Sequence, residues 1–389
     1  MEGFRDNRAR QEFWISSIAT FLCFTTMQQQ ALLAVVMKGR GMPLSQIGIV
    51  LAANGAAVVL FSLITGTVAA RLGTLTTLRL SLVLMLAAYL SFQVTIGYFP
   101  AATLSRIAQG AGYGLFMPSA LAFVRSKLTQ TRLVYLVGIF ASMIPLPSAI
   151  GPPLGEIYLK TFGDQWYFLA SAVPLALAAL LSAGLTDDGA ILGGNARLPL
   201  LQTALLPSLR RPLVAILVVG ALYGLIQSYM APLLIEKNVP IWYFYTISAI
   251  VLFGSRFVLM SRLTATSRMG LVAAGLATMA VSYVLVGLFA SPAPIAVAGV
   301  LFGLGYSVAF PTLSVVVTEQ FEPHQRSTPL ALFNALFSLG ILITPWFGTY
   351  VISALGYNGL LYVLAAAGLG SIVYLRFTPK TEHRFIPET

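Results

Sequence analysis

The chain has 389 residues, of which 58% are hydrophobic and only 9% are charged, whereas soluble globular proteins carry about 25% charged residues. This composition excludes an ordinary soluble enzyme and indicates a membrane protein with many spans. The net charge of +11 would suit a nucleic-acid-binding protein, but the basic residues lie in the loops between apolar segments, so we expect no nucleic-acid partner.

Long charge-free segments recur along the chain, and one membrane span needs roughly 20 apolar residues. We predict an all-α membrane protein with twelve transmembrane helices in two pseudo-symmetric six-helix bundles. The predicted helices cover residues 12–37, 44–69, 75–95, 100–124, 132–155, 165–186, 212–235, 241–262, 268–290, 294–318, 327–352 and 358–377. The N-terminal bundle takes residues 1–186, a cytoplasmic linker 187–211, and the C-terminal bundle with a short cytoplasmic tail 212–389. Within the linker, residues 198–209 are a candidate surface helix.

The distribution of lysine and arginine predicts the orientation of the chain. With both termini inside, 17 of the 23 basic residues lie on the cytoplasmic side and 4 outside, while Arg106 and Arg256 fall within spans. Basic residues of membrane proteins concentrate in cytoplasmic loops. We therefore predict a multi-pass protein of the cytoplasmic (inner) membrane with both termini in the cytoplasm.

The inventory of reactive side chains argues against an intramembrane enzyme. The histidines, His324 and His383, fall in a loop and in the tail, and no pair of carboxylates lies within a span. The chain also has no Gly-x-x-x-x-Gly-Lys nucleotide-binding loop. We expect a protein that is not an enzyme, that uses no cofactor or metal, and that is not driven by ATP.

An internal repeat with an offset of 193 residues relates the two halves. The first set of repeated residues is Gly110, Gly112, Tyr113, Pro118, Pro152 and Gly155, and the second set is Gly303, Gly305, Tyr306, Pro311, Pro345 and Gly348. The repeat predicts that the fourth helix superposes on the tenth, and the fifth on the eleventh.

Residues 138–156 concentrate glycine and proline near the end of the fifth predicted helix. Their spacing resembles the antiporter signature on the fifth helix of exporters in the major facilitator superfamily. Four residues match the signature, whereas Pro147 replaces one of its glycines and Glu156 the last; the four are Gly138, Gly151, Pro152 and Gly155. The alternative is a packing hinge in an unrelated membrane protein.

Two further motifs resemble the same superfamily. In the loop after the second helix Gly66, Arg71 and Gly73 match, but Ala70 replaces the aspartate that helps to latch the halves in relatives. Arg71 is therefore either a gating residue or a positive-inside anchor. On the fourth helix the motif of arginine, glutamine and two glycines is present as Arg106, Gln109, Gly110 and Gly112.

The resemblance links Arg106 to proton transfer, and the alternative is a structural arginine bonded to carbonyls of the first helix. A charge within a span is costly and should face a cavity or a partner. No acidic residue lies near the middle of any predicted helix, so Glu156 is the best candidate for a proton carrier beside Arg106.

Polar and aromatic residues in several helices are candidates to line a substrate cavity. Arg256 is the second intramembrane cation, with snorkelling toward the cytoplasm as its alternative. Successive helical residues turn by about 100°, so three consecutive glutamines cannot all face one cavity. The candidate substrate-binding residues are Gln28, Gln29, Gln30, Arg106, Gln109, Tyr113, Gln227, Tyr229, Arg256, Tyr306 and Asn334. The candidate gating and hinge residues are Gly66, Arg71, Gly73, Gly138, Pro147, Gly151, Pro152, Gly155, Pro345 and Gly348.

The resemblance implies a secondary active transporter that works by alternating access, because parallel halves of this kind build the superfamily. Two arginines without a nearby acid favour a small anionic or zwitterionic organic solute as the substrate. We expect efflux coupled to protons by a monomer in the lipid bilayer. The alternatives are an importer or exchanger of an organic anion and, further off, a lipid flippase or a non-transporting sensor.

Overall fold

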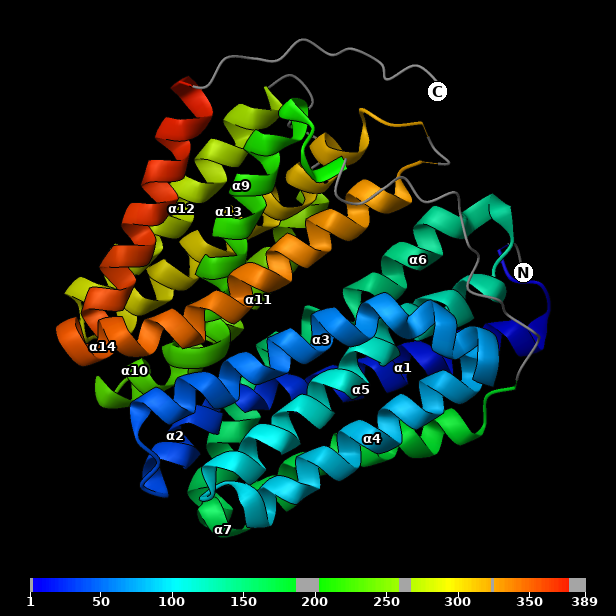
Figure 1. The fold of residues 1–389 in the computed structure, drawn as a ribbon, viewed down its shortest axis with the longest axis horizontal. Helices are drawn as coiled ribbons and strands as arrows, with labels where there is room; N and C mark the ends of the chain where they lie inside the picture. Colours follow the sequence, from blue (N-terminus) through cyan, green and yellow to red (C-terminus); the bar gives the residue numbers. More distant parts are fainter. Residues whose placement is uncertain (1–2, 187–202, 259–266, 323–324, 378–389) are drawn as a thin grey trace. The chain divides into compact units, whose positions relative to one another are not determined.

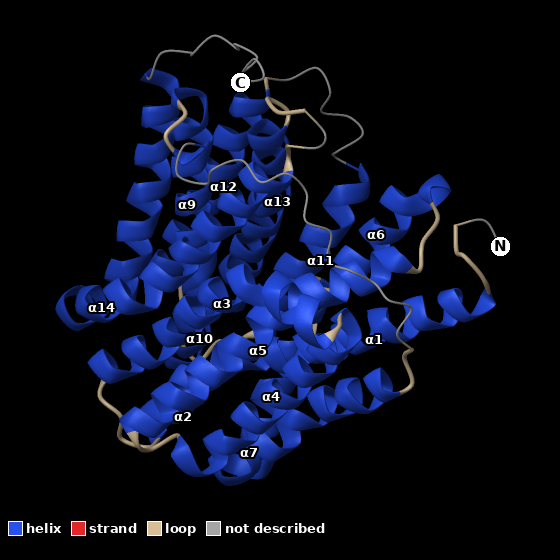
Figure 2. Ribbon diagram, turned by 45° about the vertical axis from the view of Figure 1, so that its right-hand side comes forward, coloured by secondary structure: helices blue, strands red, loops and turns tan. Residues whose placement is uncertain are grey.

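The computed structural model describes residues 3–186, 203–258, 267–322 and 325–377. This part of the chain is built of helices joined by short connections (Figure 2), and its only extended pairing is an isolated bridge between Phe4 and Leu128. The chain divides into two compact units, Met1–Gly193 and Gly194–Thr389. Each unit is a bundle of long apolar helices (Figure 1).

In the N-terminal unit the first crossing changes from α-helical to 3₁₀ geometry, and the last crossing follows a bend. The first crossing consists of α1 (Asn7–Gln29), the short 3₁₀ segment η1 (Gln30–Leu32) and α2 (Leu33–Gly39). The remaining elements are α3 (Leu44–Leu72), α4 (Thr74–Thr95), α5 (Phe99–Ser126), η2 (Gln130–Arg132), α6 (Leu133–Ser142), η3 (Leu146–Ala149) and α7 (Gly151–Ala183).

The C-terminal unit has the same plan. Its first crossing consists of α9 (Pro207–Leu225), the π-helical segment η4 (Ile226–Met230) and α10 (Ala231–Glu236). It continues with α11 (Trp242–Val258), α12 (Arg268–Leu288), α13 (Pro292–Thr318) and α14 (Ser327–Phe377).

The described residues contain nine apolar segments that are long enough to cross a membrane, plus the shorter apolar helix α11. Two of the nine, Tyr135–Ala183 and Thr328–Leu375, cross twice, because the backbone bends at Gly163 and at Gly356. The prediction of twelve transmembrane helices in two bundles is therefore confirmed.

The bends also confirm the internal repeat, because Gly163 and Gly356 are again 193 residues apart. Their φ angles are 67° and 73°, a left-handed backbone that glycine adopts without steric cost. The repeated glycines of α5 and α13 make equivalent close contacts. A Cβ on Gly112 would lie 2.9 Å from the carbonyl oxygen of Ser81, and one on Gly305 would lie 2.5 Å from that of Gly275.

Three predicted helices are interrupted in the structure. The helix predicted at 132–155 is broken by η3, because Pro145 and Pro147 have no N–H to donate. The helices predicted at 12–37 and 212–235 change to 3₁₀ and π geometry at η1 and η4. The helical residues of α9 begin at Pro207, within the predicted linker, whereas residues 187–202 lie outside the described part of the chain.

Candidate functional site

The three consecutive glutamines of the first crossing make different contacts, two with α7 and one with α5. A Cβ on Gly151 would lie 2.6 Å from the Cβ of Gln28, so Gln28 packs against the start of α7. Gln29 is fully buried, and its backbone carbonyl accepts a hydrogen bond of 2.6 Å from the hydroxyl of Tyr167 on α7. Gln30 instead directs its amide oxygen toward Arg106 on α5.

Arg106 is the centre of a buried polar cluster inside the N-terminal unit. Its side chain is 7% exposed, and its Nη1 donates to Oε1 of Gln30 and, over 2.6 Å, to Oε1 of Gln109 one turn along α5. Both partners are neutral amides, and none of the salt bridges among the described residues includes Arg106. Within the described residues the guanidinium therefore has no carboxylate that balances its charge.

Two polar atoms of this cluster have no hydrogen-bond partner among the described residues. They are Nε of Arg106 and Nε2 of Gln109, and both are buried. An unsatisfied buried polar group costs about 1–3 kcal/mol. Both atoms are donors, so the cluster has an excess of donors and suits a ligand that supplies acceptors.

Aromatic rings dominate the region of the C-terminal unit that corresponds to the Arg106 cluster. Tyr306 on α13 stacks on Tyr223 with ring centroids 5.0 Å apart, and it also contacts Phe310 at 5.5 Å. Phe310 in turn packs edge-on against Phe333 and Phe337, at 5.1 and 4.9 Å. We call Tyr223, Tyr306, Phe310, Phe333 and Phe337 the aromatic column.

The other predicted substrate-binding residues are distributed more widely. Tyr113 is half-buried and contacts Phe24 edge-on at 5.5 Å. Tyr229 is buried, and its hydroxyl donates over 2.8 Å to the carbonyl of Pro345, so it ties the η4 segment to α14. Gln227 is half-buried, and Asn334 is exposed and donates to the carbonyl of Leu330 on its own helix. The side chain of Arg256 lies outside the described part of the structure.

Two of the hinge glycines lie in tight contact between helices. Gly151 packs on α1, as described above, and a Cβ on Gly155 would lie 3.0 Å from Cδ1 of Leu32. Gly348 has the same role in the C-terminal unit, where a Cβ would lie 3.0 Å from Cε2 of Tyr229 on η4. A side chain at Gly138 would meet no described atom within 4 Å.

The remaining candidates for gating and coupling lie near helix ends. Pro147 lies in η3, Pro152 in the first turn of α7, and Pro345 inside α14. Gly66 and Arg71 belong to the last two turns of α3, where Arg71 is exposed, and Gly73 ends that helix with a φ of 87°. Glu156 forms an ion pair of 2.7 Å with Lys160 on the same helix.

The model of the Major Facilitator Superfamily matches residues 13–271 and 258–389, which is nearly the whole chain. This chain belongs to the major facilitator superfamily. Two methylenomycin A resistance proteins are similar to short parts of this facilitator. The protein from Bacillus subtilis is 38% identical over 79 residues, which are 20% of this chain and 17% of that protein. The protein from Streptomyces coelicolor is 32% identical over 66 residues, which are 17% of this chain and 14% of that protein.

Solved transporters share the fold of this facilitator at low sequence identity. A POT family transporter in complex with 5-aminolevulinic acid has a TM-score of 0.79 at 13% identity, with 94% of this chain and 95% of that chain covered. The nucleoside transporter NupG has a TM-score of 0.76 at 15% identity, with 94% and 98% covered. At these identities the likeness establishes the fold alone.

Sequence reasoning missed one cluster of the facilitator, at the start of α1. The carboxylate of Glu12 lies 2.5 Å from Nζ of Lys127, and both side chains are buried. Glu12 also accepts a bond of 3.1 Å from the backbone N–H of Thr186, and Lys127 donates to the carbonyl of Thr186 at 3.2 Å. The pair fixes the ends of three crossings directly before residue 187. Its partners are too far apart in sequence for spacing to indicate it.

Proposed function

We propose that this facilitator exports a small anionic or zwitterionic organic solute across the cytoplasmic membrane by alternating access, with protons as the coupling ion. The observation that carries the proposal is the buried guanidinium of Arg106, which is bonded to the neutral amides of Gln30 and Gln109. Two similar proteins are named for resistance to methylenomycin A, and this supports export over import.

The electrostatics of the cluster favour a carboxylate on the substrate. An unpaired buried cation costs several kcal/mol, and a planar guanidinium suits two parallel bonds to a carboxylate or phosphate. The unpaired donors of Arg106 and Gln109 would add to such bonds. An anionic group that reaches this cluster would therefore neutralise the charge and satisfy the donors together.

The aromatic column is a second candidate surface, within the C-terminal unit by itself, and it suits an apolar or ring-bearing group. Ligand sites are mostly apolar and aromatic, with a few placed polar groups that fix orientation. In the C-terminal unit the rings from Tyr223 to Phe310 offer such a surface.

We further propose a monomer with both termini on the cytoplasmic side, which catalyses no covalent reaction. Glu156 is the proposed proton carrier, because it lies at the end of the glycine- and proline-rich segment 138–156 and its side chain is 12% exposed.

The experiment that tests this function is a resistance assay in a bacterium without its major efflux pumps. The probes are methylenomycin A and fusidic acid, as a carboxylate antibiotic, and ethidium as a lipophilic cation. We expect the wild-type protein to raise the inhibitory concentration of at least one of the first two probes. Arg106→Ala should abolish this protection at equal membrane levels. Protection against ethidium alone, retained in Arg106→Ala, would return Arg106 to a structural role.

A further inference from the structure

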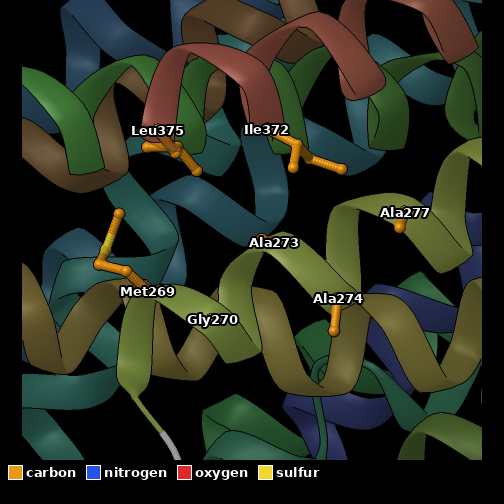
Figure 3. A pocket seen from close by; sticks show the side chains of 7 residues that line it. All are labelled: Met269, Gly270, Ala273, Ala274, Ala277, Ile372 and Leu375. Atoms are coloured by element: carbon orange, nitrogen blue, oxygen red, sulfur yellow. The ribbon is translucent and has the colours of Figure 1, made fainter. Parts of the chain in front are cut away.

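A groove lies in the C-terminal unit between α12 and the last turns of α14 (Figure 3). Its volume is about 350 Å³. Small residues of α12 face two branched side chains of α14 across the hollow, and the groove is lined by Gly270, Ala273, Ala274, Ala277, Ile372 and Leu375. Met269 lies at the end nearest the start of α12. The lining side chains are all apolar.

The surface around the groove is apolar as well. Residues three or four apart lie on one face of a helix. Val281, four residues beyond Ala277, is 48% exposed, and Leu369, three residues before Ile372, is also 48% exposed. The groove therefore opens onto the apolar surface of its own unit.

The two units differ at the position of this groove. Gly112 packs against Met85 and Gly305 against Met279, so α4 and α12 correspond with an offset of 194 residues. By this register, Arg79 of α4 stands where α12 has Ala273. The guanidinium of Arg79 donates over 3.0 Å to the carbonyl of Ser182 and over 2.9 Å to that of Ala183, at the end of α7. A long side chain thus occupies in one unit the space that an alanine leaves open in the other.

The end of α14, beside the groove, accepts a hydrogen bond from an arginine of α9. Nη2 of Arg211, in the first turns of α9, donates to the carbonyl of Leu375. Arg210 is exposed next to it, and Arg268 begins α12 with a half-exposed side chain that pairs with Glu319. Among the described residues, Arg210, Arg211, Arg268 and Glu319 therefore lie at this end, which the distribution of basic residues assigns to the cytoplasm.

We propose that the groove binds an acyl chain of an anionic phospholipid of the inner leaflet, with the lipid phosphate held by Arg210, Arg211 and Arg268. Basic pockets between transmembrane helices on the cytoplasmic side suit anionic head groups. The floor of glycine and alanine gives the chain a close fit that larger side chains would prevent. The positive charge at the mouth selects for a negatively charged head group.

Native mass spectrometry of the purified protein in detergent tests this site. The probes are dioleoyl phosphatidylglycerol and dioleoyl phosphatidylcholine, which share their acyl chains and differ in charge. We expect one phosphatidylglycerol to bind more tightly than phosphatidylcholine. Ala274→Leu should abolish this binding, because the larger side chain would prevent the close fit of the acyl chain. The fold should tolerate leucine, since the equivalent position of the N-terminal unit already holds Leu80. Ala273→Arg, which copies Arg79, should have the same effect.

A charge variant and a matched control separate the site from general lipid contact. Arg268→Gln should weaken phosphatidylglycerol binding about fivefold and leave phosphatidylcholine unchanged. Ala87→Leu adds the same three carbons at an exposed position of α4 in the N-terminal unit and should change neither lipid. The proposal would be overturned if the two lipids bound equally and Ala274→Leu left this binding unaltered. A loss of dimers in place of a loss of lipid would overturn it as well, because the occupant would then be a helix of a second copy.

Discussion

The two units of this facilitator share a scaffold and differ in the chemistry that it carries. Arg106 and Gln109 of α5 correspond at the 193-residue offset to Gly299 and Phe302 of α13. Gly299 packs on the backbone of α11, and a Cβ there would lie 3.0 Å from the carbonyl oxygen of Phe244. Phe302 instead stacks on Tyr306, with centroids 6.2 Å apart and an interplanar angle of 11°.

This difference separates residues that hold the bundle together from residues that are free to change. Gly112 and Gly305 are equivalent because each lets two helices approach within backbone contact. The bends at Gly163 and Gly356 are equivalent because only glycine accepts their backbone conformation readily. Between these fixed points one unit acquired a buried charge with amides, and the other acquired stacked rings.

The largest expected effect concerns the contacts that the units share. Gly151→Leu in one unit and Gly348→Leu in the other should each abolish transport while the protein stays in the membrane, because a side chain would collide with the adjacent helix. Gly370→Leu is the control, since a Cβ there meets no described atom within 4 Å. Efflux of a fluorescent or radiolabelled substrate, with membrane levels from immunoblots, measures the outcome. Wild-type efflux in both hinge variants would show that these helices bend passively.

The second prediction contrasts the ion pairs of the two units. Removing one partner of a buried pair costs about 3–5 kcal/mol, so Glu12→Ala should strongly lower the free energy of unfolding. The pair of Arg268 with Glu319 is partly exposed, at 53% and 31% of the side chains. Glu319→Ala should therefore cost about 1 kcal/mol or less. Denaturation in detergent, followed by tryptophan fluorescence, gives both values. Equal losses would contradict the difference in burial.

The third prediction compares the charge cluster with the aromatic column. Arg106→Lys keeps the charge but loses the planar fork, and charge-assisted hydrogen bonds contribute about 1.5–3 kcal/mol. Transport of a carboxylate should fall about tenfold or more. Phe310→Leu keeps an apolar surface and should reduce transport less. Initial rates in inverted membrane vesicles compare the two variants. A larger loss in Phe310→Leu would place the main recognition in the C-terminal unit.

The smallest expected effect concerns coupling. Glu156 lies in the N-terminal unit, and Pro345 and Gly348 mark the matching segment of the C-terminal unit, where the equivalent of Glu156 is Thr349. Glu156→Gln should remove the dependence of transport on the pH gradient and keep substrate binding. Vesicle transport at a series of imposed gradients measures this, with Thr349→Val as the control. Transport by Glu156→Gln that still follows the gradient would place the proton carrier elsewhere.

Sequence patterns predicted the fold well because membrane spans and packing glycines act locally. Length and hydropathy indicate each crossing, and the repeat of Gly110 at Gly303 indicates the two halves. The bond from Arg106 to Gln30 could not be predicted in the same way. Which of three glutamines faces α5 depends on the change from α to 3₁₀ geometry at Gln30 and on the packing of Tyr167 against Gln29.

Long-range polar contacts were beyond the sequence for a related reason. Glu12 and Lys127 each resemble a solvated charge at a helix end, and only the folded bundle brings them together. Arg79 likewise counts as a basic loop residue in the sequence, whereas its guanidinium binds carbonyls at the end of α7. Tertiary structure, not local pattern, decides which charged helix ends become buried.

The π segment between α9 and α10 changes how labelling data along this crossing must be interpreted. A π turn holds one residue more than an α turn, so side chains beyond Met230 are rotated by about 100° relative to an uninterrupted α-helix. Cysteine scanning with a water-soluble reagent along residues 207–236 should therefore show two periodic patterns that are out of phase across Ile226–Met230. A single helical wheel would assign Leu233 and its neighbours to the wrong face.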